Sequence, residues 1–229
     1  MDRTVVVTGG SGFLGGAVVE RYLADGWRAV VPWISEKEVH RLRDRVGPAP
    51  GLVLVEADVT DPDGWERVLD SAGAVDAGVL LVGGFGMAPL VETDPGAWNR
   101  LVALNATSVF QSARALLPRI GESPGGGSLV TVAAEPALDR GAPGMGAYAA
   151  TKAAVVSLTQ TLAREGAEKS VNVNAIAPRI IDTPVNREAM PDADRSSWLP
   201  PSEIAEVIAF LTGPAGRIVN GSVLTLNRG

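Results

Sequence analysis

The chain has 229 residues, enough for one domain with a large buried core, and its 46% hydrophobic and 20% charged residues are usual for a soluble globular enzyme. A net charge of −6 argues against nucleic-acid binding, and the lack of cysteine excludes a disulfide scaffold and thiol catalysis. The single histidine, His40, lies in a polar stretch beside Arg41 and Arg43, so no histidine-based metal site or triad is expected.

No segment of the sequence indicates a membrane protein. The first residues lead directly into a β-branched run, which leaves no room for a signal peptide, and no apolar run approaches the roughly 20 residues that span a bilayer. We therefore expect a cytoplasmic protein whose partner is a small-molecule substrate, with no nucleic acid, membrane or metal.

Short β-branched runs alternate with helical patterns along the chain. Strands are predicted at residues 5–7, 28–33, 52–56, 79–82, 129–133, 171–176 and 223–226. Helices are predicted at residues 16–24, 36–46, 63–72, 95–119, 148–165 and 202–211, and an irregular, polar segment at 180–201. This alternation predicts a single α/β domain over residues 1–229: a doubly wound, seven-stranded parallel sheet with helices on both faces.

A glycine-rich loop follows the first strand. It fits the pattern G-x-G-x-x-G between a strand and a helix, in which glycines let a pyrophosphate approach the backbone and the helix N-terminus supplies free N–H groups. The alternative is an ordinary glycine-rich turn. The motif predicts a dinucleotide-binding Rossmann fold, and its candidate cofactor-binding residues are Gly9, Ser11, Gly12, Phe13, Leu14 and Gly15.

The end of the second strand bears on the choice between NAD and NADP. An acidic residue there binds the ribose 2′-OH and repels a 2′-phosphate, but Trp33 is followed by Ile34 and Ser35. Nothing therefore excludes NADP, whose phosphate can meet Ser35 or Lys37, and we favour NADP over NAD. After the third strand, Asp58 and Val59 are candidates for contact with the adenine; Asp58 can equally cap the next helix.

Tyr148 and Lys152 are the candidate catalytic pair. If the stretch is helical, the two side chains lie one turn apart on the same face. A neighbouring ammonium favours the phenolate, so we expect Lys152 to lower the pKa of Tyr148 from its usual value near ~10.

With the glycine loop, this pair and the order of elements assembled, the whole chain resembles the short-chain dehydrogenase/reductase family. The resemblance implies that Tyr148 is the general acid/base and that Lys152 holds the cofactor ribose. It also implies that Asn105 supports a proton-relay water. Further cofactor contacts are implied at Gly83, Pro178, Ile181 and Thr183.

Three positions depart from the family pattern. Ala133 and Ala134, followed by Glu135, stand where most members have a serine that hydrogen-bonds the substrate carbonyl. The usual Asn-Asn-Ala-Gly after the fourth strand is replaced by residues 81–85, and Arg179 replaces the usual glycine after the sixth strand's proline.

One subgroup, quinonoid dihydropteridine reductase, is similar in residues 182–198, in Ala137-Leu138-Asp139 and in 143–145, and it also lacks the serine. The resemblance implies reduction of a quinonoid dihydropterin or of another easily reduced carbonyl or imine. Phe85, Met145 and Trp198 either line a substrate pocket or pack the loops. Asn186 and Arg187 either bind substrate or tie down the segment 184–201. The alternative functions are a ketoreductase for acyl or polyketide carbonyls and a catalytically silent redox sensor.

A homodimer or homotetramer is expected. Helices 95–119 and 148–165 carry apolar and small residues on more than the one face that a sheet covers, and two such helices from each subunit can form a four-helix interface.

Overall fold

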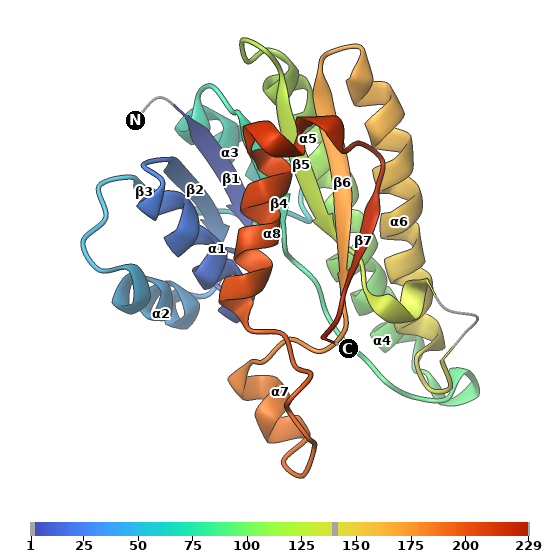
Figure 1. Cartoon of the computed structure of the whole chain (residues 1–229). Helices are drawn as coiled ribbons and strands as arrows, with labels where there is room; N and C mark the ends of the chain where they lie inside the picture. Colours follow the sequence, from blue (N-terminus) through green and yellow to red (C-terminus); the bar gives the residue numbers. More distant parts are fainter. Residues whose placement is uncertain (1–2, 139–141, 229) are drawn as a thin grey trace.

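A parallel sheet covered by helices on both faces organises the chain in the computed structural model, which describes residues 3–138 and 142–228 (Figure 1). Its strands within these ranges are β1 (Thr4–Thr8), β2 (Arg28–Trp33), β3 (Leu52–Glu56), β4 (Ala77–Leu80), β5 (Gly127–Val132), β6 (Val171–Pro178) and β7 (Val223–Leu226). They form one seven-stranded sheet in the order β3-β2-β1-β4-β5-β6-β7, with every neighbouring pair parallel. The predicted fold class is confirmed.

Two layers of helices enclose the sheet. The helices are α1 (Phe13–Ala24), α2 (Glu36–Val46), α3 (Gly64–Ala72), α4 (Pro95–Leu101), α5 (Ser108–Gly121), α6 (Gly146–Ala167), α7 (Pro184–Ala189) and α8 (Pro201–Thr212). One face is covered by α1, α2 and α8, and the other by α3, α5 and α6, so that two separate apolar clusters form (Figure 1). No helix within the described ranges is long and apolar enough to cross a membrane.

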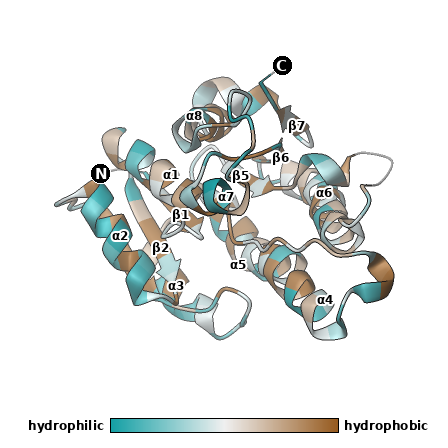
Figure 2. Cartoon of the chain, turned by 90° about the horizontal axis from the view of Figure 1, so that it is seen from below, coloured by the Kyte–Doolittle hydropathy of each residue, from teal (hydrophilic) through white to brown (hydrophobic). Residues whose placement is uncertain are grey.

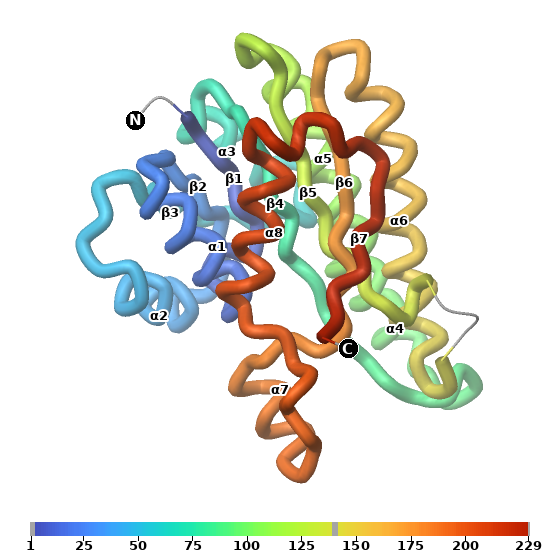
Figure 3. The backbone as a smooth tube through the Cα atoms, in the orientation of Figure 1, coloured from blue at the N-terminus to red at the C-terminus, as the bar shows by residue number. Residues whose placement is uncertain are grey.

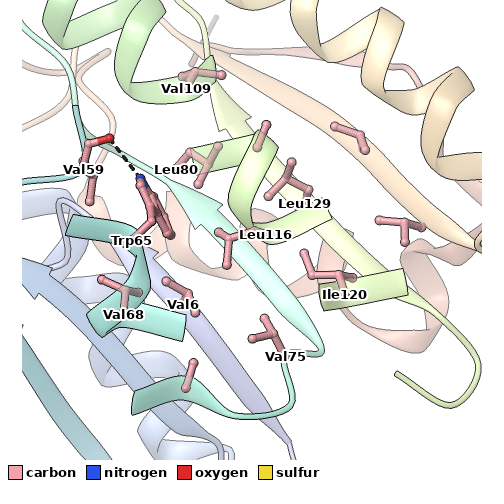
Figure 4. Packing of buried hydrophobic residues seen from close by; sticks show 14 of the residues in the cluster. Val6, Val59, Trp65, Val68, Val75, Leu80, Val109, Leu116, Ile120 and Leu129 are labelled. Atoms are coloured by element: carbon pink, nitrogen blue, oxygen red, sulfur yellow. Dashed lines mark hydrogen bonds between the residues drawn. The ribbon is translucent and has the colours of Figure 1, made fainter. Parts of the chain in front are cut away.

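Branched and aromatic side chains fill the cluster beneath α3 and α5. Val6, Leu80 and Leu129 project from three neighbouring strands and pack against Leu116 of α5, each of them at most 2% exposed (Figure 4). Trp65 of α3 packs in the same cluster and donates a hydrogen bond from Nε1 to the carbonyl of Val59 at 3.1 Å (Figure 4). Because a buried indole N–H needs an acceptor, this bond helps to hold the loop after β3 against the core.

The predicted helix 95–119 is not one continuous α-helix. It begins as expected, with Pro95 at the first helical position and the Asp94 carboxylate accepting the Ala97 N–H at 3.0 Å. However, α4 ends at Leu101 and a π-helical segment, Val102–Thr107, separates it from α5. A π-helical turn contains one residue more than an α-helical turn, and this difference changes the direction in which Asn105 points.

The segment 180–201, predicted to be irregular, contains a short helix. Its N-cap is Thr183, whose Oγ1 accepts the Asn186 N–H at 3.3 Å, and Pro184 occupies the first helical position. A threonine followed by proline is an ordinary signal for a helix start, so α7 could have been predicted from the sequence. The segment extends past the carboxyl ends of the strands (Figure 3).

Two element boundaries differ slightly from those predicted. Helix α1 begins at Phe13 rather than residue 16, and β4 covers Ala77–Leu80 rather than 79–82.

Candidate active site

The candidate residues gather at the carboxyl edge of the sheet. The strand order reverses between β1 and β4, which is the point where doubly wound sheets bind ligands. Gly9, directly after β1, adopts φ +67° and lies so close to the end of β4 that a Cβ there would come within 2.9 Å of the Val82 nitrogen. Viewed onto this edge, α7 lies in front of the strand ends (Figure 2).

The glycine loop has the shape of a phosphate cradle. A Cβ at Gly15 would overlap the Gly9 carbonyl oxygen, so only glycine allows the loop to close against the start of α1. The N-cap of α1 is Gly12, which has no side chain to cap the first N–H groups. These donors and the positive end of the helix dipole suit the pyrophosphate of a dinucleotide. Leu14 lies in the first turn and is partly buried in the core.

Two residues of α2 that were not predicted as site residues hold this loop. Ser11 donates its hydroxyl to the Glu38 carboxylate at 3.0 Å, and Arg41 donates to the Ser11 carbonyl at 2.8 Å. The Arg41 guanidinium also lies 4.2 Å from the centre of the Phe13 ring and pairs with Glu38 at 3.4 Å. The spacing from residue 38 to 41 placed both side chains on one face of a helix, but nothing local indicated that this face meets the loop.

Asn105 connects three parts of the site through a fully buried amide. Its Oδ1 accepts the Gly84 N–H at 2.9 Å, and its Nδ2 donates to the Gly84 carbonyl and to the Thr151 hydroxyl, both at 3.0 Å. The π-helical segment turns Asn105 inward to reach both partners. The amide therefore joins the loop after β4 to α6 at Thr151, between Tyr148 and Lys152.

Lys152 is 5% exposed and donates from Nζ to the carbonyl of Val132, at the end of β5, at 2.8 Å. A Cβ on Gly83 would lie 3.2 Å from that ammonium and 2.9 Å from Asn105 Oδ1, so the absence of a side chain at Gly83 leaves room for both groups. Burial lowers the pKa of Lys152 to about 8, so the side chain remains mainly charged at neutral pH.

Tyr148 lies one turn before Lys152 on α6, in an edge-to-face contact with the exposed ring of Phe85, with the ring centroids 5.1 Å apart. Its pKa differs from the sequence-based prediction. Burial raises the pKa of Tyr148 to about 12, because the phenolate is poorly solvated. The phenol is therefore neutral near pH 7, as a proton donor requires.

The ends of β5 and β6 carry the departures from the family pattern. Ala133 and Ala134 are buried at 1% and 4% exposure and offer no side-chain donor. Glu135 follows them and forms an ion pair with Arg179, which comes directly after Pro178 at the end of β6.

The segment after β6 is tied to itself by polar contacts. Arg187 binds both oxygens of Asp182, at 2.6 and 2.7 Å, and Asn186 donates to the Ile181 carbonyl at 2.8 Å. These contacts favour the tie-down interpretation of Asn186 and Arg187. Trp198 is 3% exposed, so its ring packs in the interior. The hydroxyl of Thr183 caps α7.

Asp58 does not cap a helix. Its carboxylate accepts the backbone N–H and the hydroxyl of Thr60, at 2.8 and 2.7 Å, because the loop after β3 forms an Asx turn. Helix α3 starts at Gly64, six residues after Asp58, and its N-cap is Asp63. Asp58 is exposed, whereas Val59 is buried. Trp33 pairs with Glu56 in the β2–β3 register, so it lies at the same edge of the sheet as Asp58.

Large apolar side chains are left exposed around this edge. Seven of the exposed large hydrophobic residues follow the carboxyl ends of β2, β4, β5 and β6: Ile34, Phe85, Met87, Leu90, Val91, Leu138 and Val185. Apolar side chains gathered in this way are typical of a surface that binds a ligand.

Comparison with known proteins agrees with this geometry. The profile of the family described as short chain dehydrogenase matches residues 3–194. The 3-oxoacyl-[acyl-carrier-protein] reductase FabG of Vibrio cholerae is 30% identical, with 99% of this chain and 96% of the relative covered. The 2,5-dichloro-2,5-cyclohexadiene-1,4-diol dehydrogenase LinX of Sphingobium indicum is 28% identical, with 99% and 95% covered. A 3-ketoacyl-(acyl-carrier-protein) reductase from Brucella melitensis, solved with NADH, superimposes with a TM-score of 0.85 at 25% identity, with 98% of this chain and 96% of that chain covered.

The buried ammonium of Lys152 predicts a pH-dependent stability. Its pKa falls from 10.5 in the unfolded chain to about 8 in the folded one, so between these values the unfolded state binds more protons and stability rises with pH. From pH 8 to pH 10 the free energy of unfolding should increase by up to about 3 kcal/mol more in the wild type than in Lys152→Met. Urea unfolding at pH 8, 9 and 10 measures this difference. The exposed variant Lys169→Met should follow the wild type, and parallel curves for Lys152→Met would contradict the prediction.

Proposed function

Because the chain belongs to the short-chain dehydrogenase/reductase family, and is therefore an NAD(P)-dependent oxidoreductase, we propose that it transfers hydride from NAD(P)H to a small, easily reduced substrate, a quinonoid dihydropterin or an activated carbonyl or imine. The observation that carries this proposal is the buried pair Ala133 and Ala134 at the end of β5. With no hydroxyl there to bind a developing oxyanion, Tyr148 acts as the donor without the usual serine.

Each residue of the site has a physical role in this proposal. The nicotinamide, when bound, supplies the hydride. Tyr148 gives the proton from its phenol Oη, which burial keeps neutral. Lys152, held by the Val132 carbonyl, presents its remaining N–H donors to the cofactor ribose. Asn105 fixes Gly84 and Thr151, and thereby the position of α6 relative to the loop after β4.

The missing serine favours one class of substrate. A single donor to a developing oxyanion contributes about 2.7–4 kcal/mol in other enzymes, so its absence slows the reduction of an ordinary ketone. A quinonoid ring needs less help, because hydride transfer restores a stable conjugated ring. The resemblance to quinonoid dihydropteridine reductase that we infer for residues 182–198 from the sequence alone points to the same class. Asp139, which belongs to another part of that similarity, lies outside the described residues.

Substitution of Tyr148 tests the proton donor. In Tyr148→Phe, turnover of quinonoid dihydropterin with NADPH should fall by about 10²-fold or more, the usual effect of losing a general acid, while NADPH affinity changes little. The matched control is Tyr22→Phe, which removes a phenol bound to Thr212 far from the site and should leave turnover unchanged. Full turnover by Tyr148→Phe would show that another group gives the proton.

The 30% identity to a 3-oxoacyl-[acyl-carrier-protein] reductase supports a second candidate, reduction of acyl or polyketide carbonyls. Acetoacetyl thioesters in the same assay distinguish the two: rapid turnover of the thioester with none of the dihydropterin would favour the ketoreductase.

NADP(H) is the cofactor we propose, and Arg41 is the residue that favours it. The two residues directly after β2, Ile34 and Ser35, are not acidic. The Arg41 guanidinium, which pairs with Glu38, lies on the Ser11 carbonyl and the Phe13 ring, beside the glycine loop. An arginine at this place accommodates a 2′-phosphate. Ser35 and Lys37 begin α2 nearby and add donors.

Binding constants test this role without a known substrate. In Arg41→Gln, the Kd for NADPH should rise at least about 10-fold because a charged contact to phosphate is lost, and the Kd for NADH should change less than about 3-fold. Arg43→Gln, an exposed arginine of the same helix, is the control and should alter neither. Equal losses for both cofactors would mean that Arg41 only shapes the loop.

We also propose that the protein is a homodimer or homotetramer through α4, α5 and α6. Phe110 of α5 is 50% exposed and Ala153 of α6 is exposed, although Ala113 is buried in the core. Charge placed at the centre of such an interface should dissociate it. Light scattering after gel filtration should show a smaller assembly for Phe110→Glu, while Phe210→Glu, 45% exposed on the opposite layer, stays assembled. A monomeric wild type would overturn the proposal.

A further inference from the structure

An ion pair joins the loops after β5 and β6. Val132 pairs with Ile176 in the sheet register, and the Ala133 N–H donates to the Ile176 carbonyl at 2.8 Å. Three residues beyond this pair on each strand, Glu135 and Arg179 therefore come side by side, with Oε2 and Nε 3.5 Å apart.

This ion pair lies close to the candidate catalytic residues. Lys152 donates to the carbonyl of Val132, three residues before Glu135, which corresponds to about 10 Å along the strand direction. Helix α6, which carries Tyr148 and Lys152, also packs against the short helical turn Glu135–Ala137. The ion pair therefore lies at the same edge of the sheet as Tyr148 and Lys152, against the helix that carries them.

Of three arginines near the carboxyl edge of the sheet, Arg179 has the weakest polar contacts. Arg187 is held by both oxygens of Asp182, and Arg195 donates to the Pro191 carbonyl and lies over the Trp198 ring. Within the described residues, the side chain of Arg179 has one polar contact, the 3.5 Å approach to Glu135, and it is 53% exposed. An ion pair this exposed contributes little to stability, so its groups are available to a ligand.

The two groups together select the chemistry of that ligand. A guanidinium offers N–H donors only and a carboxylate offers acceptors only. An anion bound to Arg179 alone would bring its charge next to Glu135 and leave that carboxylate without a counterion. A ligand that carries a carbonyl acceptor beside N–H donors satisfies both side chains at once: the carbonyl accepts from Arg179, and the N–H groups donate to Glu135.

We propose that Glu135 and Arg179 are specificity-determining residues that bind the amino-oxo-pyrimidine edge of a flat heterocycle, with Glu135 accepting from the ring N–H and amino groups and Arg179 donating to the ring carbonyl. This inference rests on the proposed function, because it places the reducible ring of the same heterocycle next to Tyr148. It explains why a carboxylate and a guanidinium occupy the two strand ends where the family pattern has neither.

Two stable, fluorescent ligands provide the test, measured by equilibrium binding to the full-length protein with NADP⁺ present. Pterin carries the 2-amino donor, whereas lumazine has a carbonyl oxygen in its place and a proton on the adjacent N1; the rest of the two ring systems is the same. The wild type should bind pterin at least about 10-fold more tightly than lumazine. Glu135→Ala should abolish this ratio, and Arg179→Ala should weaken both ligands at least about 10-fold. Glu188→Ala, an exposed carboxylate of α7, is the matched control and should change neither.

Equal affinities in the wild type, an unchanged ratio in Glu135→Ala, or no binding of either ligand would each overturn the inference. None of these results touches the proposed function, which is decided separately by turnover in the Tyr148→Phe assay. Thermal unfolding of each variant checks that the fold is intact, as expected for side chains on the surface.

Discussion

The buried ammonium of Lys152 imposes a constraint on which the rest of the site depends. A charge with 5% exposure is costly unless it is hydrogen-bonded, and the bond to the Val132 carbonyl meets this need only when α6 lies close against the end of β5. The same closeness requires Gly83, because a side chain there would meet the ammonium. One desolvated charge thus sets the spacing between α6, β5 and the loop after β4.

Asn105 adds a second constraint of the same kind. Its amide is completely buried, and an unsatisfied amide would be costly, so its bonds to Gly84 and Thr151 hold three elements in register. The π-helical turn that makes these bonds possible interrupts a favourable α-helix. Irregular turns of this type are frequent at functional sites, and here the irregularity positions the helix that bears Tyr148.

The scaffold is that of the family, and the chain's own character lies in the groups around its carboxyl edge. Alanines replace the usual donor after β5, an ion pair of Glu135 and Arg179 stands beyond them, and Arg41 reaches the glycine loop from α2. Each change adds or removes a charge or a hydrogen-bond donor at the edge of the sheet where the candidate site lies, while the core remains apolar. Such an arrangement keeps the fold and alters what it recognises.

The sequence by itself determined the alternation of strands and helices, the parallel sheet, the glycine loop and the place of Tyr148 and Lys152, because these depend on local periodicity and short spacings. Helix α7, although it was predicted as irregular, could also have been predicted from Thr183 and Pro184. Only the tertiary structure decided the inward turn of Asn105, the contact of Arg41 with the loop and the pairing of Glu135 with Arg179, since these depend on helix rotation and strand register. It also reversed the expected pKa shift of Tyr148, because burial is a property of the packed chain and not of a residue's neighbours in sequence.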